Sequence, residues 1–284
     1  MRSKLWKFHA DCIQYSLKVA NSHMGAAEAR RTQPWSVSDD SLKRFVLHAS
    51  ESCIQDLLSA SGENSRDDGW KVLAIGGGVE ISRRSNGPLD MLRGRRKLRI
   101  PASHFKAVAT AIDTAKQWDP NLTEGSYIKD LHENLSIIRL RFSESSKPLF
   151  KNREFVVYER RETMDDGTFV VGVASLPNEI AKGVLPKSRG KFVRGLLIQS
   201  GWVIESMEQR DSCMVTYVVQ MDPAGWLPKW VVNRLSMRLV SVIDDLFKLV
   251  QNSVPQDLDF DPSNNDSSNT LQFRLQCPSS NNRP

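Results

Sequence analysis

Apolar side chains recur at helical spacing in two long segments, one in the first quarter of the chain and one near its end. In residues 38–60, Ser38 and two acidic residues precede the apolar positions, as in a capped first helical turn. The apolar positions there are Leu42, Phe45, Val46, Ala49, Cys53 and Leu57. In residues 228–251 they are Val231, Leu235, Leu239, Val242, Leu246 and Val250. Both segments therefore predict amphipathic helices.

Strand patterns occupy much of the chain between these helices. Residues 70–85 predict a hairpin around Gly76-Gly77-Gly78, and residues 92–101 predict a further strand. From residue 135 onward, short apolar runs separated by turn residues predict sequential antiparallel strands. These runs are 135–142, 153–162, 168–176, 191–208 and 212–221. A longer insertion at 177–190 separates two of them.

A third helix is predicted to begin at Ser103 and to close at Pro120, with a brief helical continuation over 126–134. The pattern as a whole predicts an α+β fold, in which a curved antiparallel sheet grips a long C-terminal helix. We expect one folded domain at 36–253. Residues 1–35 form an N-terminal extension, compatible with a short helix or with disorder. Residues 254–284 are rich in Ser, Asn and Asp and predict a disordered tail.

Charge and cysteine content narrow the possible environments. The 284 residues include 39 basic and 33 acidic side chains, for a formal charge of +6. This excess fits an ordinary solvated surface or a basic face toward an anionic membrane, whereas nucleic-acid binding lacks a supporting aromatic and basic repeat. The cysteines are scattered without a CxxC pair, which is typical of free thiols in a reducing compartment. With neither a signal-peptide pattern nor a long uncharged apolar run, we expect a cytoplasmic protein.

The sequence lacks the motifs of a catalytic or metal centre. Ile81 stands where a phosphate-binding GxGxxG loop would need its last glycine, so the triple glycine fits a hairpin turn better. The five histidines never fall at HxxxH or HExxH spacing, and there is no GxSxG. Residues 257–261 lack the glycine and distal glutamate of a calcium loop. We therefore expect neither an enzyme nor a protein with a cofactor or metal.

Charged side chains inside two predicted strands suggest a polar contact in an apolar interior. Arg141 alternates onto the same face as Ile137, and Glu159 onto the same face as Phe155 and Val157. If both faces point inward, Arg141 and Glu159 could meet as a buried ion pair, which is costly unless the charges are paired. The alternative is that both are solvent-facing charges of the sheet.

The stretch "QMDPAGWLPKWVVN", residues 220–233, turns a strand into the last helix. Pro228 suits the first turn of that helix. The stretch resembles the Asp-Pro-x-Gly-Trp-x-Pro-x-x-x-x-Asn corner of the steroidogenic-acute-regulatory-related lipid-transfer (START) domains. "QWDP", "REFVVYERRE", "VASLPNEIAKGVLP" and "GWVIESM" also occur in the order of that family. The resemblance covers residues 36–252, approximately. Within the family, the chain is similar to plant proteins made of a START domain alone.

This resemblance implies the helix-grip fold, with an internal tunnel for one lipid between the sheet and the last helix. The corner would set the angle of that helix across the tunnel mouth, with Trp226 and Trp230 either wedging the angle or packing in the core. The insertion 177–190 matches the family's omega loop. Several relatives hold an acid where Arg141 sits and an arginine where Glu159 sits, so the reversed order here argues against transferring a sterol specificity.

The function that the resemblance implies is binding of a single lipid, which the protein carries or senses between membranes without catalysis. The implied lipid-binding residues are Arg141, Glu159, Val184, Leu185, Asn233 and Met237. The ligand would be a sterol, phospholipid or sphingolipid, and we expect a monomer that contacts membranes peripherally and binds no nucleic acid. Two alternatives stay open: a cyclase-like or hydrolase-like enzyme with a helix-grip cavity, and a lipid-regulated interaction module.

Overall fold

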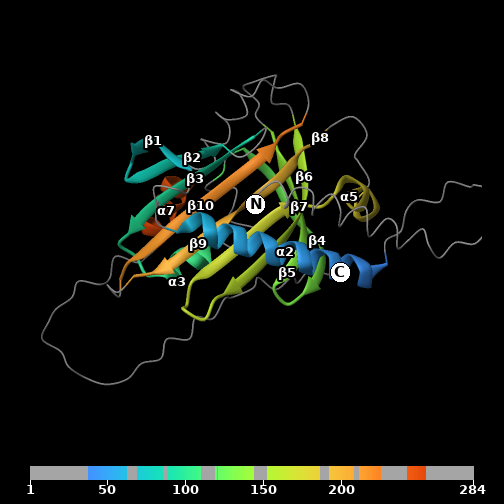
Figure 1. Cartoon of the computed structure of the whole chain (residues 1–284), viewed down its shortest axis with the longest axis horizontal. Helices are drawn as coiled ribbons and strands as arrows, with labels where there is room; N and C mark the ends of the chain where they lie inside the picture. The colour runs from blue at the N-terminus through green and yellow to red at the C-terminus, as the bar shows by residue number, and fades with distance from the viewer. Residues whose placement is uncertain are drawn as a thin grey trace, which may run out of the picture.

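One sheet of ten strands forms the centre of the protein (Figure 1). The structure is a computed structural model that describes residues 38–62, 69–85, 89–109, 119, 121–143, 152–185, 192–207, 211–224 and 242–253. The strands are β1 (Trp70–Gly76), β2 (Val79–Ser85), β3 (Asp90–Leu98), β4 (Leu122–His132), β5 (Leu135–Phe142), β6 (Arg153–Thr163), β7 (Phe169–Ser175), β8 (Val193–Arg194), β9 (Leu196–Ser206) and β10 (Cys213–Asp222).

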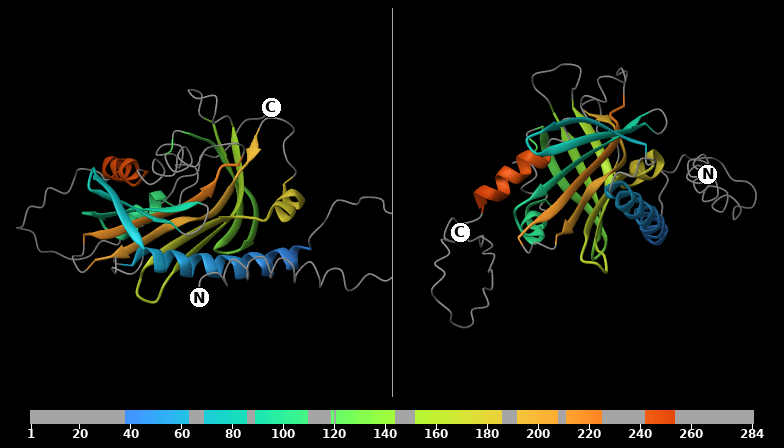
Figure 2. Two further views of the ribbon diagram at one scale, coloured as in Figure 1. Left: turned by 45° about the horizontal axis from the view of Figure 1, so that its top comes forward. Right: turned by 60° about the vertical axis from the view of Figure 1, so that its left-hand side comes forward.

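The strand order is β1-β2-β3-β10-β9-β7-β6-β5-β4, and β8 pairs with β6 from off this path. All neighbours on the path are antiparallel, as the short turns between the apolar runs predict, whereas β6 and β8 are parallel. The sheet is strongly twisted and curved (Figure 2). The last strand, β10, lies between β3 and β9 and so joins two groups of strands made earlier in the chain.

The first helix, α2 (Asp39–Ser61), confirms the helix predicted at 38–60. Ser38 is its N-cap, because the Ser38 Oγ accepts a hydrogen bond from the Ser41 backbone N–H at 3.3 Å. The helix lies across β6, β7, β9 and β10. Its buried apolar side chains pack against strand residues such as Val156, Val170 and Val203. We call the sheet face under α2 the outer face.

Two other helices, α3 (Ala102–Ala109) and α7 (Val242–Ser253), lie on the opposite face, which we call the inner face (Figure 2). Three residues of the predicted stripe of the last helix, Val242, Leu246 and Val250, are buried there. They share a core with strand side chains that include Phe169, Trp202 and Val215. The remainder of that predicted helix, 228–241, lies outside the described residues.

The structure contradicts one predicted element and confirms another. The helical continuation predicted at 126–134 is wrong, because these residues lie in β4 and the turn that follows it. The ladder between β4 and β5 is irregular at three places, which breaks the alternation that identifies a strand in a sequence. The hairpin predicted at 70–85 is confirmed, and Gly77 and Gly78 form its turn with φ of 59° and 79°.

The insertion at 177–190 contains one short helix, α5 (Asn178–Val184). The predicted N-terminal extension 1–35 and tail 254–284 lie outside the described residues, as do Trp226 and Trp230. None of the helices that the structure describes is long and apolar enough to cross a membrane.

Candidate functional site

The inner face of β5 and β6 is apolar. Ile138, Phe155 and Val157 are buried together on this face. Four partly buried side chains from neighbouring strands extend this surface: Leu140, Phe142, Val173 and Leu197. Because side chains alternate along a strand, every second residue of β6 from Arg153 onward belongs to the inner face.

The predicted pair of Arg141 and Glu159 is not formed. In the register between β5 and β6, Arg141 lies opposite Glu154, and Glu159 lies opposite Ser136. Since Glu154 and Glu159 are an odd number of positions apart, they project to opposite faces of the sheet. Arg141 therefore shares the outer face with Ile137, which is buried under α2, whereas Glu159 lies on the inner face. The prediction assumed the wrong register between the two strands.

Glu159 instead forms an ion pair with Arg161 on its own strand. The distance from the Glu159 Oε1 to the Arg161 Nη2 is 2.6 Å, and the Glu159 side chain is 14% exposed. The Arg161 Nη2 also donates a hydrogen bond to the Tyr127 hydroxyl at 3.0 Å. Burial raises the pKa of Glu159 above its ordinary value, and the charge of Arg161 opposes that rise. The cluster presents donors and acceptors that can hold a polar group.

Sequence reasoning missed Arg161 and Tyr127. Arg161 could have been found, because a residue two positions from Glu159 on a strand lies on the same face. Tyr127 could not, since its strand was predicted as a helix. The three side chains line a pocket of about 530 Å³ beside the turn between β4 and β5, within the size range of ligand pockets. Ser136 and His132 contribute further polar atoms to its lining.

A second polar contact lies further along the inner face. The Ser200 hydroxyl donates a hydrogen bond to the Tyr217 hydroxyl at 3.1 Å, and the rings of Trp202 and Tyr217 lie 4.4 Å apart. Burial raises the pKa of Tyr217 to about 12, so its phenol stays neutral. The inner face is therefore apolar with isolated polar groups, and these groups can orient a bound molecule rather than react with it.

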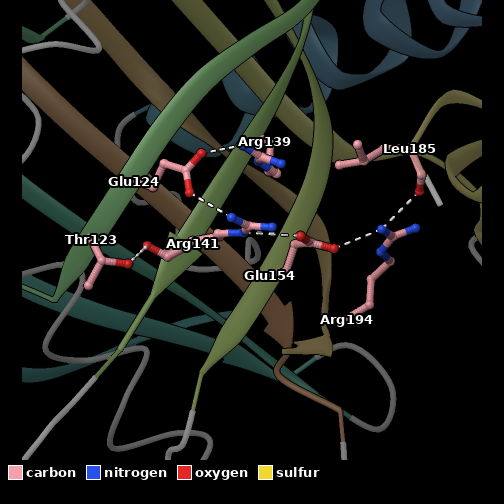
Figure 3. A network of polar contacts seen from close by, with 7 residues as sticks. All are labelled: Thr123, Glu124, Arg139, Arg141, Glu154, Leu185 and Arg194. Atoms are coloured by element: carbon pink, nitrogen blue, oxygen red, sulfur yellow. Dashed lines mark hydrogen bonds and ion pairs between the residues drawn. The ribbon is translucent and has the colours of Figure 1, made fainter. Parts of the chain in front are cut away.

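On the outer face, Arg141 belongs to a chain of ion pairs (Figure 3). Its guanidinium lies 2.7 Å from the carboxylate of Glu124 and 3.2 Å from that of Glu154. Glu154 also pairs with Arg194 at 2.7 Å, with side chains that are 2% and 3% exposed. The Arg194 Nη2 donates a further hydrogen bond to the carbonyl of Leu185 at 3.0 Å. The chain thus connects three strands and β8 to the end of α5.

The first residues of the corner at 220–233 are described and adopt a specific turn. The Asp222 carboxylate accepts a hydrogen bond from the Ala224 backbone N–H at 2.8 Å, and Ala224 has a φ of 56°. The Arg153 Nε donates to the carbonyl of Pro223 at 2.7 Å, and its Nη2 reaches the carbonyl of Ala224 at 3.4 Å. An inner-face side chain of β6 therefore holds the start of the corner.

The START domain model matches residues 51–255. This chain belongs to the START domain family. START domain-containing protein 10 of Mus musculus and its counterpart of Homo sapiens are each 30% identical to it over 192 residues. The match covers 65% of this chain and 62% of each relative, so the chain spans less than two thirds of the curated relatives it matches.

Solved structures show the same START fold. Human StAR-related lipid transfer protein 5 has a TM-score of 0.65 and 20% identity, with 74% of this chain and 98% of that chain covered. Human STARD10 has a TM-score of 0.61 and 23% identity, with 79% and 84% covered. Together with the curved antiparallel sheet and its C-terminal helix, these likenesses confirm the predicted helix-grip fold.

The residues predicted to bind lipid in this START domain are spread over three locations. Glu159 lies on the inner face and Arg141 on the outer face. Val184 and Leu185, in the segment that matches the omega loop, lie at the end of α5, half-buried against the core that holds α2. Asn233 and Met237 lie outside the described residues.

Proposed function

We propose that this START domain binds a single lipid against its inner face and carries or senses it between membranes, without catalysing a reaction. The observation that supports this most directly is an apolar inner face that ends at the half-buried ion pair of Glu159 and Arg161. The name of a protein with the same fold, StAR-related lipid transfer protein 5, supports the same function.

The length of the inner face suits the apolar part of a membrane lipid. Arg153 and Glu159 are six positions apart on β6, which corresponds to about 20 Å along a strand. The hydrocarbon half of a bilayer is roughly 15 Å thick. A lipid with its polar group at Glu159 would therefore extend along β6 as far as the level of the corner.

Enclosing the lipid would remove the main barrier to transfer. Each methylene exposed to water costs about 0.8 kcal/mol, or about 14 kcal/mol for a chain of about eighteen carbons. At 1.4 kcal/mol per factor of ten, this corresponds to roughly a 10¹⁰-fold penalty on spontaneous transfer through water. An apolar protein surface that replaces water along the route lowers this barrier, and no reactive group is needed.

Within this proposal, Glu159, Arg161 and Tyr127 orient the polar end of the lipid. A carboxylate accepts from a hydroxyl or an amide N–H, a guanidinium donates to a hydroxyl, amide or phosphate oxygen, and a phenol can do either. A sterol, a phospholipid and a sphingolipid therefore all remain candidate ligands. Asn233 and Met237 stay predicted lipid contacts of the last helix. Arg141, on the outer face, would act on the site through the ion pairs that reach α5.

We further infer that the protein is a monomer and contacts membranes peripherally through the end of α5. Lys182 on α5 is exposed, and Lys187, Arg189 and Lys191 follow in the sequence. Val193 and Ile198, just beyond them, are 41% and 45% exposed. Basic side chains next to exposed apolar ones suit an anionic bilayer surface.

Native mass spectrometry of the purified full chain, followed by lipid extraction, tests the proposal. We expect one lipid per chain after incubation with vesicles made from a total-lipid extract. Val173→Trp, on the inner face, should reduce lipid uptake at least tenfold by filling the space. Val72→Trp makes the same change at an exposed position of β1, away from the surface proposed to meet the membrane, and should leave uptake unchanged. A wild-type chain that neither copurifies with lipid nor takes it from vesicles would contradict the proposal.

A further inference from the structure

Two consecutive residues at the start of β6 hold two segments that are far apart in the sequence. Arg153 projects from the inner face and donates hydrogen bonds to the carbonyls of Pro223 and Ala224, at the start of the corner. Glu154 projects from the outer face and pairs with Arg194, which donates to the carbonyl of Leu185 at the end of α5. The corner and α5 are thus both attached to a single dipeptide.

The strand β8 connects these two attachments through the backbone. It pairs in parallel with the start of β6, with Glu154 opposite Arg194. The Gly195 backbone N–H donates to the Glu154 carbonyl at 3.0 Å. A Cβ on Gly195 would lie 2.6 Å from the Phe155 ring and 3.1 Å from the Asp222 carbonyl oxygen. Gly195, directly after β8, therefore fits closely between β6 and the end of β10, which places the two attachments in contact through one short segment.

Burial makes the α5 attachment costly to break. The side chains of Glu154 and Arg194 are 2% and 3% exposed, so neither charge can reach water while the other stays in place. Separating a buried ion pair leaves an uncompensated charge, which is strongly unfavourable. Arg194 donates to Glu154 and to the Leu185 carbonyl through the same Nη2 atom. Displacing the end of α5 therefore leaves a buried N–H of Arg194 without its acceptor, beside the ion pair.

We propose that Arg153 and Arg194 are positioning residues for lipid exchange, which make α5 and the corner move as one unit. The link to lipid rests on the proposed function, because Arg153 lies on the inner face along which the lipid is proposed to extend. The mechanical coupling rests only on the contacts at the start of β6. Entry or exit of a lipid then requires both segments to leave the sheet together, so the rate of exchange depends on this one dipeptide.

Hydrogen exchange of the lipid-free full chain tests the coupling. Arg153→Met removes the contacts to the corner and leaves Glu154 and Arg194 intact. We expect amide exchange at least about fivefold faster both at 221–224 and at 178–185, since coupled segments open together. Arg83→Met, which removes a half-exposed arginine that pairs with Asp90 on β3, is the matched control and should change neither segment. Faster exchange confined to 221–224 would overturn the coupling.

The reciprocal variant and a transfer assay complete the test. Arg194→Lys keeps a cation beside Glu154 but loses the fork that also reaches Leu185, so it should accelerate exchange at 221–224 as well as at 178–185. The transfer assay follows lipid from donor vesicles made of total lipid to acceptor vesicles made of phosphatidylcholine. Both variants should change the transfer rate at least about threefold, whereas the amount of lipid bound per chain should stay the same. A positioning residue affects how fast the lipid enters and leaves and not how much is bound. Unchanged rates alongside normal wild-type transfer would overturn the role in exchange. Absence of wild-type transfer would instead count against the proposed function, and hydrogen exchange would still decide the coupling.

Discussion

At the scale of single residues, Glu159 is the group whose charge the inner face controls. Burial raises the pKa of this carboxyl, with Arg161 opposing the rise. An acid whose pKa is higher in the folded state binds its proton more tightly there than in the unfolded chain. The free energy of unfolding therefore falls as pH rises through the window between the unfolded and the folded pKa.

Replacing Glu159 by Gln should remove this contribution to the pH dependence of stability. Because the amide carries no charge to bury, Glu159→Gln should be at least as stable as the wild type at pH 7. Its advantage should disappear below the ordinary pKa of a glutamate, where the wild-type carboxyl is protonated in both states. Urea unfolding of the lipid-free protein between pH 4 and 8 measures this. Glu133→Gln, at an exposed turn, serves as the control. An advantage that grows as the pH falls would contradict the assignment.

The sequence could predict which side chains share a face within one strand, but not how neighbouring strands are paired. Alternation placed Glu159 with Phe155 and Val157. It could not reveal that Arg141 lies opposite Glu154, because a slip between two strands leaves the pattern inside each strand unchanged. A shift of the pairing between two strands by an odd number of residues places a side chain opposite a residue of the other face. The predicted ion pair of Arg141 and Glu159 was wrong for this reason.

At the scale of elements, the local sequence was sufficient to predict the helix α2 but not to predict the strand β4. The helix carries its own cap at Ser38 and a continuous apolar stripe, both encoded within about twenty residues. The strand takes its shape from an irregular ladder to β5, which only the partner strand defines. The short helix α5 lies in a segment that the sequence marked only as an insertion.

The packing of α2 on the outer face should depend on one glycine more than on its neighbour. A Cβ on Gly201 would lie 2.0 Å from the Val171 carbonyl oxygen and 2.5 Å from the Leu57 Cδ1. A Cβ on Gly172 would meet only side-chain atoms, the nearest being the Ile54 Cδ1 at 3.1 Å. Backbone atoms cannot yield as side chains do. We expect Gly201→Ala to cost about 3 kcal/mol or more and Gly172→Ala about 1 kcal/mol or less.

Chemical unfolding of both glycine variants measures these costs. Circular dichroism should show native helix content for Gly172→Ala, so that any difference reflects stability alone. Equal losses at the two positions would mean that the β7 backbone at Val171 and the Leu57 side chain of α2 can both yield to a Cβ at Gly201.

At the scale of the whole molecule, docking on a membrane depends on where its charges lie and not only on how many there are. We expect Lys182→Glu, Lys187→Glu and Arg189→Glu together to weaken binding to anionic vesicles by at least tenfold, because each basic residue near such a surface contributes about 1 kcal/mol. Sedimentation with phosphatidylcholine vesicles, with and without phosphatidylserine, measures the loss, which should shrink at high salt.

A second triple variant with the same change in net charge provides the control. Lys71→Glu, Lys97→Glu and Arg99→Glu reverse three exposed charges on β1 and at the end of β3, on the side of the sheet away from α5 (Figure 1). This variant should bind the anionic vesicles nearly as well as the wild type. Equal losses in the two triple variants would show that the overall charge, and not the region of α5, governs membrane contact.

The position of β10 has a consequence during protein synthesis. Cys213 in β10 pairs with Leu98 in β3, a separation of 213 − 98 = 115 positions. Until β10 leaves the ribosome, β1–β3 and the strands from β4 to β9 are two incomplete sheets, each with an unpaired edge at β3 or β9. Such edges template association with other chains. A nascent chain that stalls before residue 213 should therefore depend on chaperones. Once β10 is synthesised and pairs with both edges, that dependence should end.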